Sequence, residues 1–249
     1  MRARVLFTLA SLTLSVHAMA ADLKVLTAGA FKPVVVAVAA DFERQTGLHL
    51  VIDNDTGGAL ARRIAGGEHF DVAVLPEGAF KALAKQAPGP ALALAQVGIG
   101  VAVKRGAAAP DIGTVDAFRR ALIDARAVAY IDPAAGGSSG VYLAQLFDKM
   151  GVASQISRKA VLVPGGLVAE RVVSGEADLG IHQISEILAV PGALLVGPIP
   201  AEIQNYTVYA AAPSATAPAR PAQALLLMLR GETARKVMAE RGMEAVTSR

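Results

Sequence analysis

The chain has 249 residues, of which 53% are hydrophobic, and it carries a formal net charge of +3 with no cysteine and no tryptophan. The lack of cysteine excludes disulfides, thiolate metal sites and cysteine nucleophiles. Basic residues are scattered and not interleaved with aromatic ones, so the pattern of a nucleic-acid-binding surface is absent and we expect no nucleic-acid partner.

The first twenty residues have the features of a secretory signal peptide. Arg2 and Arg4 precede an apolar run over 5–16, and Ala18-Met19-Ala20 has the small-x-small pattern of a cleavage site. The run is too short to span a bilayer as a helix. We expect cleavage after Ala20 and release of a soluble protein into the periplasm. Its net charge is +1, because the leader holds two arginines and no acid.

The first part of the mature chain alternates β-rich runs with helical patterns. Short β-rich runs lie at 23–28, 48–53 and 70–75, and helical spacing of apolar residues covers 31–46 and continues after Thr56. Strands and helices that alternate in this way predict a parallel sheet with crossover helices.

The same alternation returns after a helix near 78–85 and a link rich in proline and glycine. The run 97–103 predicts a strand that crosses to a second lobe, and 206–211 predicts the returning strand, followed by helices at 223–229 and 233–241. Between the crossings we expect strands at 128–131, 161–163 and 178–182, an extended piece at 194–196, and helices at 116–125, 139–150, 168–173 and 185–188. The chain is therefore expected to form an α/β protein with a ligand cleft between two lobes: lobe I from 21–102 and 206–249, lobe II from 103–205.

Two junctions between a strand and a helix have the composition of an anion site. One is Thr56-Gly57-Gly58, and the other is Ser138-Ser139-Gly140. The first turn of a helix leaves backbone N–H groups without partners and carries partial positive charge, so it can hold an anion without a cationic side chain. The alternative is that both are ordinary loops of an α/β protein.

Five segments resemble, in order and spacing, the periplasmic molybdate-binding proteins of ABC transporters. They are TAGA at 27–30, DTGGALARRI at 55–64, FDVAVLPE at 70–77, DPAAGGSSGVY at 132–142 and SGEADLGIHQ at 174–183. The resemblance covers nearly the whole mature chain. It implies a type II periplasmic binding protein fold, a small anionic ligand between the lobes and an ABC permease as partner. We expect a monomer that uses no cofactor.

The resemblance also implies which residues contact the ligand: Ala30, Thr56, Gly57, Gly58, Ser138, Ser139, Gly140 and Gln183. In the molybdate binders a serine stands at the position of Ala30, and a tyrosine at that of Gln183. The hydroxyl donors missing at Ala30 and Gly57 favour a small carboxylate, whereas the resemblance favours molybdate, and both remain open.

A second resemblance points to chemistry. GIHQISEIL at 180–188, VPG at 190–192 and VGPIPAEIQ at 196–204 are similar to the branch of the same superfamily that contains periplasmic aconitate isomerases. Moving a double bond in a tricarboxylic acid requires a base and an acid within reach of the substrate, and His182 or Glu186 would carry the proton, with Tyr142 as a further candidate. The alternative for these side chains is a structural role, so we expect binding without chemistry to be the first function and isomerisation the second.

Three arginines are candidate clamps for a carboxylate, because guanidinium groups bind carboxylates bidentately. They are Arg62, Arg63 and Arg171, and the alternative for each is a solvated surface charge. The four histidines are spread along the chain with no cysteine near them, so we expect no metal site.

Overall fold

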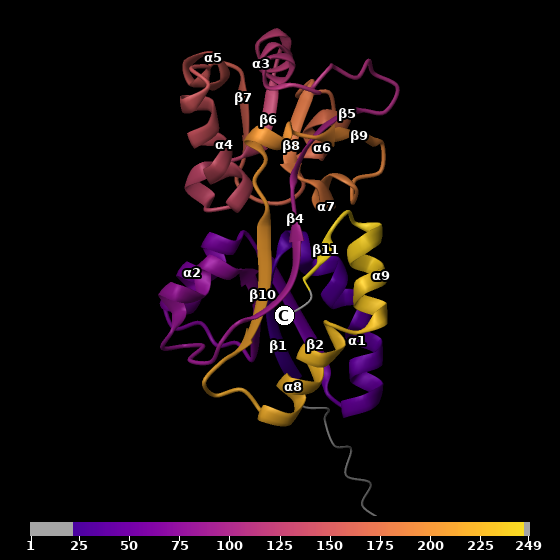
Figure 1. The fold of residues 1–249 in the computed structure, drawn as a ribbon. Helices are drawn as coiled ribbons and strands as arrows, with labels where there is room; N and C mark the ends of the chain where they lie inside the picture. Colours follow the sequence, from indigo (N-terminus) through magenta and orange to yellow (C-terminus); the bar gives the residue numbers. More distant parts are fainter. Residues whose placement is uncertain (1–21, 247–249) are drawn as a thin grey trace, which may run out of the picture.

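The computed structural model describes residues 22–246, so the signal peptide expected at 1–20 lies outside the described residues. The described chain forms two α/β lobes, one above the other in the view of Figure 1, and each lobe has its own sheet. Within 22–246, no helix is both long enough and apolar enough to cross a membrane.

Lobe I is built on a six-stranded sheet with the order β11-β4-β10-β3-β1-β2. Its strands are β1 Asp22–Ala28, β2 His49–Asp55, β3 Val72–Pro76, β4 Leu92–Val97, β10 Thr207–Pro213 and β11 Glu244–Ala245. Its helices are η1 Gly29–Phe31, α1 Lys32–Thr46, α2 Gly57–Ala65, η2 Glu77–Leu83, α8 Ala219–Met228 and α9 Glu232–Glu240.

The parallel sheet predicted for the first part of the chain is confirmed. β1 pairs in parallel with both β2 and β3, and α1 and α2 are the crossovers. β10 lies antiparallel between β3 and β4, because the chain re-enters lobe I from the other lobe. The helix expected near 78–85 is the 3-10 helix η2.

The sheet of lobe I is buried on both faces. Leu23 and Val25 of β1 pack into a core shared with α1, α8 and α9, whereas Leu26 packs into a core shared with α2 and η2. Side chains alternate across a strand, so one strand feeds both cores. This double covering fixes the position of β1 and of the loop that follows it.

Lobe II is built on a five-stranded sheet with the order β7-β6-β8-β5-β9. Its strands are β5 Ile99–Lys104, β6 Val128–Ile131, β7 Ala160–Val163, β8 Leu179–Gln183 and β9 Ala193–Pro198. Its helices are α3 Val115–Asp124, η3 Pro133–Ala135, α4 Ser138–Lys149, α5 Ala153–Ser157, α6 Ala169–Val173, α7 Ile184–Ile187 and η4 Ala201–Ile203. β6 runs parallel to β7 and β8, as the three parallel strands of lobe I do.

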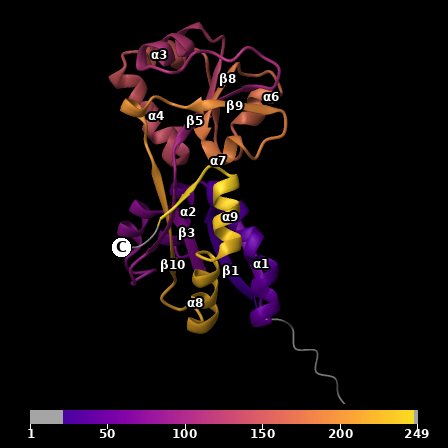
Figure 2. The ribbon, with the colours of Figure 1, turned by 45° about the vertical axis from the view of Figure 1, so that its right-hand side comes forward.

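Two segments carry the chain between the lobes (Figure 2). The chain changes sheet at Gly98, which lies before the division at Ala102 that the sequence predicts, and it returns between β9 and β10. Gln204 joins the two segments, since it accepts a hydrogen bond from the Ile99 N–H at 2.8 Å and donates one to the Ile99 carbonyl at 2.9 Å. A side chain at Gly98 would lie 3.2 Å from Gln204, so a small residue is needed at this crossing.

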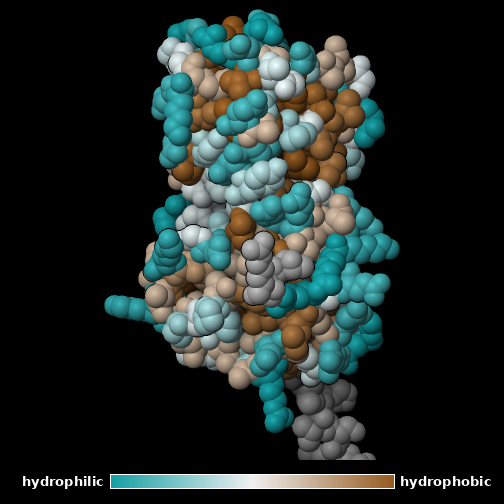
Figure 3. All heavy atoms as spheres, viewed as in Figure 1, coloured by the Kyte–Doolittle hydropathy of each residue, from teal (hydrophilic) through white to brown (hydrophobic). Residues whose placement is uncertain are grey.

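Hydrophilic side chains are scattered over both lobes on the face shown in Figure 3, with apolar side chains exposed between them. The large apolar residues with the greatest exposure come from many elements of both lobes: Val36, Val51, Val141, Leu162, Leu188, Leu194, Tyr206 and Leu227.

Candidate functional site

A cavity of about 510 Å³ lies between the lobes. Its wall comes from the carboxyl ends of the parallel strands: the residues after β1, β2 and β3 in lobe I, and those after β6, β7 and β8 in lobe II. Ligands of α/β proteins bind outside the carboxyl ends of such strands, where the loops are free to vary. The two sheets thus direct six loops at one enclosed space.

Two helix starts face this cavity. α2 begins at Gly57 and α4 at Ser138, and both residues line the cavity. Thr56 caps α2, because its Oγ1 accepts a hydrogen bond from the Ala59 N–H at 3.1 Å. The Gly57 N–H of α2 and the first backbone N–H groups of α4 supply donors to the same space, and both helix starts add partial positive charge.

Six of the eight predicted ligand residues line the cavity: Ala30, Thr56, Gly57, Ser138, Ser139 and Gln183. The other two, Gly58 and Gly140, do not line it. The structure shows a packing role for each of these two glycines, and their contact with a ligand stays a prediction.

Gly58 is where lobe I touches lobe II. Its backbone N–H donates to the Gly136 carbonyl at 3.0 Å, and a Cβ at Gly58 would lie 2.6 Å from that oxygen. The Thr56 hydroxyl donates to the neighbouring Ala135 carbonyl at 2.6 Å. This contact between the start of α2 and the loop before α4 holds the lobes together at the edge of the cavity.

Gly140 lets α4 pack against β6. A Cβ at this position would lie 2.2 Å from the carbonyl oxygen of Ile131, a distance that backbone atoms cannot accommodate. We predict that Gly140→Ala lowers the free energy of unfolding by about 1–3 kcal/mol, the usual cost of overpacking a well-packed core. Urea denaturation measures this. Gly78→Ala is the control, because no atom lies within 4 Å of the added methyl; equal stability of the two variants would contradict the packing role.

Ser138 lies in a polar cluster that joins the lobes. Gln183 Nε2 donates to Ser138 Oγ at 3.0 Å and to Thr207 Oγ1 at 2.9 Å, and Thr207 Oγ1 donates to Ser138 Oγ at 3.2 Å. The two lone pairs of Ser138 are then used, so its own proton is left to donate. Tyr209, which also lines the cavity, hydrogen-bonds with Ser138, and burial raises the pKa of its phenol. Ser138 is thereby oriented as a donor at the start of α4.

His182 and Glu186 form a buried pair in the cavity wall. β8 ends at Gln183 and α7 begins at the next residue, and this short connection brings His182 Nε2 to 3.1 Å from Glu186 Oε2, with 3% and 12% of the side chains exposed. Burial lowers the pKa of His182 to about 3 and raises the pKa of Glu186 to about 8, because each charged form loses its hydration. Burial therefore favours the uncharged form of both groups, a carboxylic acid beside a neutral imidazole.

Three buried polar atoms around this pair have no hydrogen-bond partner among the described residues. They are His182 Nδ1, Gln183 Oε1 and Ser185 Oγ, and all three residues line the cavity. Buried polar atoms are nearly always paired, and three adjacent exceptions along one segment are unusual. They indicate that β8 and the start of α7 face a partner from outside the chain.

Other candidates lie away from the cavity. The Tyr142 hydroxyl donates to the Ile203 carbonyl at 2.8 Å, and Arg171 pairs with Glu176 at 3.2 Å on the exposed end of α6. Neither residue lines the cavity, which favours the structural alternative for Tyr142 and the surface-charge alternative for Arg171. Each group is engaged in its own lobe.

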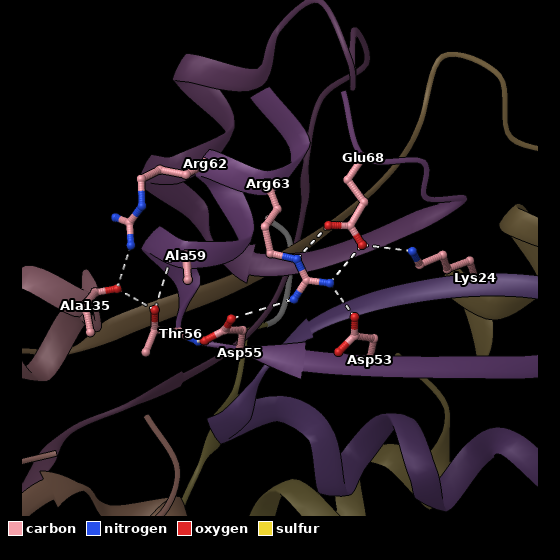
Figure 4. A network of polar contacts seen from close by, with 9 residues as sticks. All are labelled: Lys24, Asp53, Asp55, Thr56, Ala59, Arg62, Arg63, Glu68 and Ala135. Atoms are coloured by element: carbon pink, nitrogen blue, oxygen red, sulfur yellow. Dashed lines mark hydrogen bonds and ion pairs between the residues drawn. The ribbon is translucent and has the colours of Figure 1, made fainter. Parts of the chain in front are cut away.

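Arg62 and Arg63 point in different directions from α2 (Figure 4). Arg62 reaches across to lobe II and donates to the Ala135 carbonyl at 3.2 Å, the oxygen that Thr56 also contacts. Arg63 turns back onto lobe I, where it bonds Glu68 at 2.6 and 2.8 Å and pairs with Asp53. Neither lines the cavity, which favours the alternative of a charge outside the ligand site for both.

The ion pairs of Arg63 should contribute to the free energy of unfolding in a pH-dependent way. Hydrogen bonds from Arg63 and Lys24 lower the pKa of Glu68 from 4.5 to about 2, so this network stabilises the fold above pH 4.5 and loses its effect as the pH falls toward about 2. We predict that Arg63→Met lowers the free energy of unfolding by about 1 kcal/mol at neutral pH and by nearly nothing near pH 2. Urea titrations at both values measure it, with the same change at exposed Arg119 of α3 as control. A pH-independent loss would contradict the assignment.

Several cavity residues were not predicted as ligand contacts from the sequence. Lys32 and Asn54 of lobe I and Ser185 of lobe II line the cavity, as does Tyr209 of β10. Among the described residues of the wall, Lys32 is the only lysine or arginine. Lys32 directly follows the loop that contains Ala30, so its position in the sequence could have indicated a place in the site. No feature of the sequence indicates Tyr209, because it reaches the site only through the insertion of β10 beside β3.

The described residues contain no group of three or more histidines and acids that could hold a metal ion.

Comparison with known proteins agrees with this geometry. Residues 23–244 match the family described as bacterial extracellular solute-binding protein. The chain belongs to this family. It is 36% identical to an aconitate isomerase from a Pseudomonas species, over 90% of this chain and 88% of that protein.

Two solved structures of other binding proteins share the fold of this chain. The periplasmic molybdate-binding protein of Azotobacter vinelandii superposes with a TM-score of 0.69 at 21% identity, over 91% of this chain and 100% of that one. The sulfate-binding protein SubI of Mycobacterium tuberculosis superposes with a TM-score of 0.71 at 18% identity, over 91% of this chain and 87% of that one. The predicted two-lobed type II periplasmic binding protein fold and the resemblance to molybdate-binding proteins are confirmed.

Proposed function

We propose that the cleft binds a small polycarboxylate of the aconitate class and that His182 and Glu186 move a proton on it, which gives an aconitate isomerase on a solute-binding fold. The observation that carries this proposal is the buried pair at 3.1 Å in the cavity wall. A receptor for an oxyanion needs only donors, whereas a neutral acid bonded to a neutral base is suited to proton transfer. The relative named aconitate isomerase, 36% identical along most of the chain, supports the same function.

The size of the cavity also favours an organic anion. Its 510 Å³ falls in the range of about 300–1,000 Å³ that small-molecule sites occupy. Ala30 and Gly57 line it without hydroxyl groups, so their part of the wall offers a tetrahedral oxyanion no side-chain donors. Carboxylates would instead bind the Gly57 N–H and the backbone N–H groups at the start of α4, with Ser138, Ser139 and Lys32 beside them.

The proposed reaction conserves atoms and charge. Glu186 passes its proton to His182, and the carboxylate then removes a proton from the methylene carbon of the substrate. The resulting carbanion is delocalised into the adjacent carboxyl groups, and the His182 imidazolium balances its charge. Glu186 returns the proton to the former vinyl carbon, which shifts the double bond, and His182 gives its proton back. The new double bond forms in either geometry, so cis- and trans-aconitate interconvert.

A second function is capture without chemistry, in which the protein delivers a small anion to an ABC permease. The observations that favour it are the family match over 23–244 and the two helix starts at the cavity. For both functions we propose an exported, periplasmic protein whose leader is removed after Ala20. The two functions share binding and differ in turnover.

The test is to incubate the purified mature protein with cis- or trans-aconitate and to follow interconversion by chromatography. Thermal shifts with aconitate, with tricarballylate (the saturated analogue, which cannot isomerise) and with molybdate measure binding in parallel. A ligand present at a hundred times its Kd adds about 2.7 kcal/mol of apparent stability. We expect turnover and a shift with both carboxylates. Binding without turnover would support the transport receptor, and a shift with molybdate alone would contradict the carboxylate proposal.

The pH dependence of kcat is a further prediction. The bound pair keeps its single exchangeable proton between the pKa of about 3 for His182 and that of about 8 for Glu186. We expect kcat to be nearly constant between these values and to fall as the pH rises above about 8, because the pair then lacks the proton that balances the carbanion. Initial rates at saturating aconitate measure it. A profile that falls below about pH 6 would contradict a neutral His182.

A further inference from the structure

We infer that lobe I completes the acid–base pair: when the lobes close, contact with Gly29 covers the carboxyl group of Glu186, and this covering leaves the group protonated. The inference rests on the proposed function for its meaning in catalysis. The geometry behind it depends on the contact between the lobes alone.

Glu186 belongs to lobe II, yet its carboxyl group lies against lobe I. A Cβ built on Gly29 would be 2.9 Å from Glu186 Oε1 and 4.0 Å from Asn54 Nδ2. Gly29 begins η1 directly after β1, and Asn54 is at the end of β2. One side of the carboxyl group thus meets His182 of its own lobe, and the other side meets the backbone of the opposite lobe.

The described structure has its lobes in contact on two sides. At one side the Gly58 N–H and the Thr56 hydroxyl donate to carbonyls of the loop before α4. At the other, Arg241 after α9 donates to the Leu188 carbonyl after α7 at 3.2 Å. Entry of a ligand requires these contacts to part, as in hinge motions between domains. Parting moves Glu186 away from Gly29 but leaves it beside His182, because both belong to lobe II.

The charge of Glu186 then depends on closure. In the parted state the carboxyl group of Glu186 faces water, so its pKa returns toward the ordinary 4.5 and the group is ionised near pH 6.5. In the closed state burial in the contact raises the pKa to about 8, and the group is protonated. The titratable or charged residues that share the cavity with it are His182, Tyr209, Asp55 and Lys32. Closure at this pH therefore leaves the carboxyl group protonated, and the proton comes from solvent or from the adjacent His182. A polycarboxylate in the closed cleft then meets a neutral acid, not a second negative charge.

The first test needs no ligand. The chain has no cysteine, so Thr56→Cys combined with Ala135→Cys places two unique thiols across the lobe contact, where oxidation locks the lobes together. Infrared difference spectra between the oxidised and reduced protein at pH 6.5 report protonated carboxyl groups. We expect such a band to appear on oxidation and to be missing when Glu186→Gln is added.

The outcomes that would overturn the inference are distinct. A band already present in the reduced protein would show that Glu186 is protonated without closure, and no band on oxidation would show that contact does not protonate it. Pairing of the two cysteines is checked by mass before the spectra are compared. None of these outcomes depends on whether aconitate is the substrate.

The second test uses the reaction. Gly29→Ala places a methyl group 2.9 Å from Glu186 Oε1 and displaces the carboxyl group from its covered position. We expect the alkaline limb of the kcat profile to move from about pH 8 toward lower pH, whereas Gly78→Ala of the same lobe leaves it unchanged. An unchanged profile in Gly29→Ala would overturn the role of Gly29. Absence of turnover in the unsubstituted protein would refute the proposed function and leave the cross-linking result to decide the inference.

Discussion

Glu186→Gln is expected to lower the turnover of aconitate by roughly 10²–10⁴-fold, the usual contribution of a positioned acid–base group. Glutamine keeps the shape of the protonated acid and its capacity to donate a hydrogen bond, but it cannot exchange a proton with carbon. Because Glu186 is uncharged in the closed site at neutral pH, the substitution removes no charge from the bound state, and KM should not rise. Initial rates with cis-aconitate measure both constants.

Two further variants make this result specific. His182→Asn should also lower kcat, since it removes the imidazole that receives the proton of Glu186 at 3.1 Å. Glu202→Gln is the matched control, because Glu202 is an exposed acid of η4 in the same lobe, and its turnover should equal that of the unsubstituted protein. Normal turnover in Glu186→Gln would exclude the buried pair as the proton carrier.

Gly58→Ala is expected to weaken binding of tricarballylate by roughly ten- to hundredfold. The added Cβ would lie 2.6 Å from the Gly136 oxygen and 2.8 Å from Gly136 Cα, both of them backbone atoms of the other lobe. Overpacking costs about 1–3 kcal/mol, and each 1.4 kcal/mol is about tenfold in affinity. The lobes can relieve this clash by staying apart, so the cost falls on closure and on ligand binding.

The location of the clash separates this variant from Gly140→Ala. Gly58 meets a neighbour from the other lobe, whereas Gly140 meets Ile131 within its own lobe. Gly58→Ala should therefore keep the free energy of unfolding of the ligand-free protein, measured in urea, while calorimetry shows the loss in affinity. Gly78→Ala should change neither quantity. Unchanged affinity in Gly58→Ala would contradict closure of the cleft at this contact.

The sequence was most informative where periodicity repeats. The alternation of β-rich runs and helical spacing predicted β1, β2 and β3 with their crossover helices, and parallel pairing followed because crossover connections permit it. His182 and Gln183 were placed at the end of a buried strand, and both line the cavity. The break at Gly98 was missed, because one apolar run continues across two strands that belong to different sheets.

Adjacent glycines and adjacent arginines show that the local sequence pattern does not predict which residue lines the cavity. Gly57 and Gly58 are adjacent, yet only Gly57 lines the cavity, and the same holds for Ser139 and Gly140. Arg62 and Arg63 are adjacent as well, but they point to different lobes. Neighbours on a helix are separated by about 100° of rotation, so which of them reaches the ligand depends on how the helix is packed.

The sequence by itself determined the α/β class, the two lobes and the loops that end at the cleft, because these follow from the period of apolar residues and from the residues that stop a strand or begin a helix. Only the tertiary structure decided that His182 and Glu186 are a buried pair, that Gly29 of the other lobe lies against Glu186, and that Tyr209 and Lys32 belong to the wall. The physical reason is that burial, and with it the protonation of a carboxyl group, depends on atoms brought from both lobes. No periodicity along the chain encodes such contacts between residues more than a hundred positions apart.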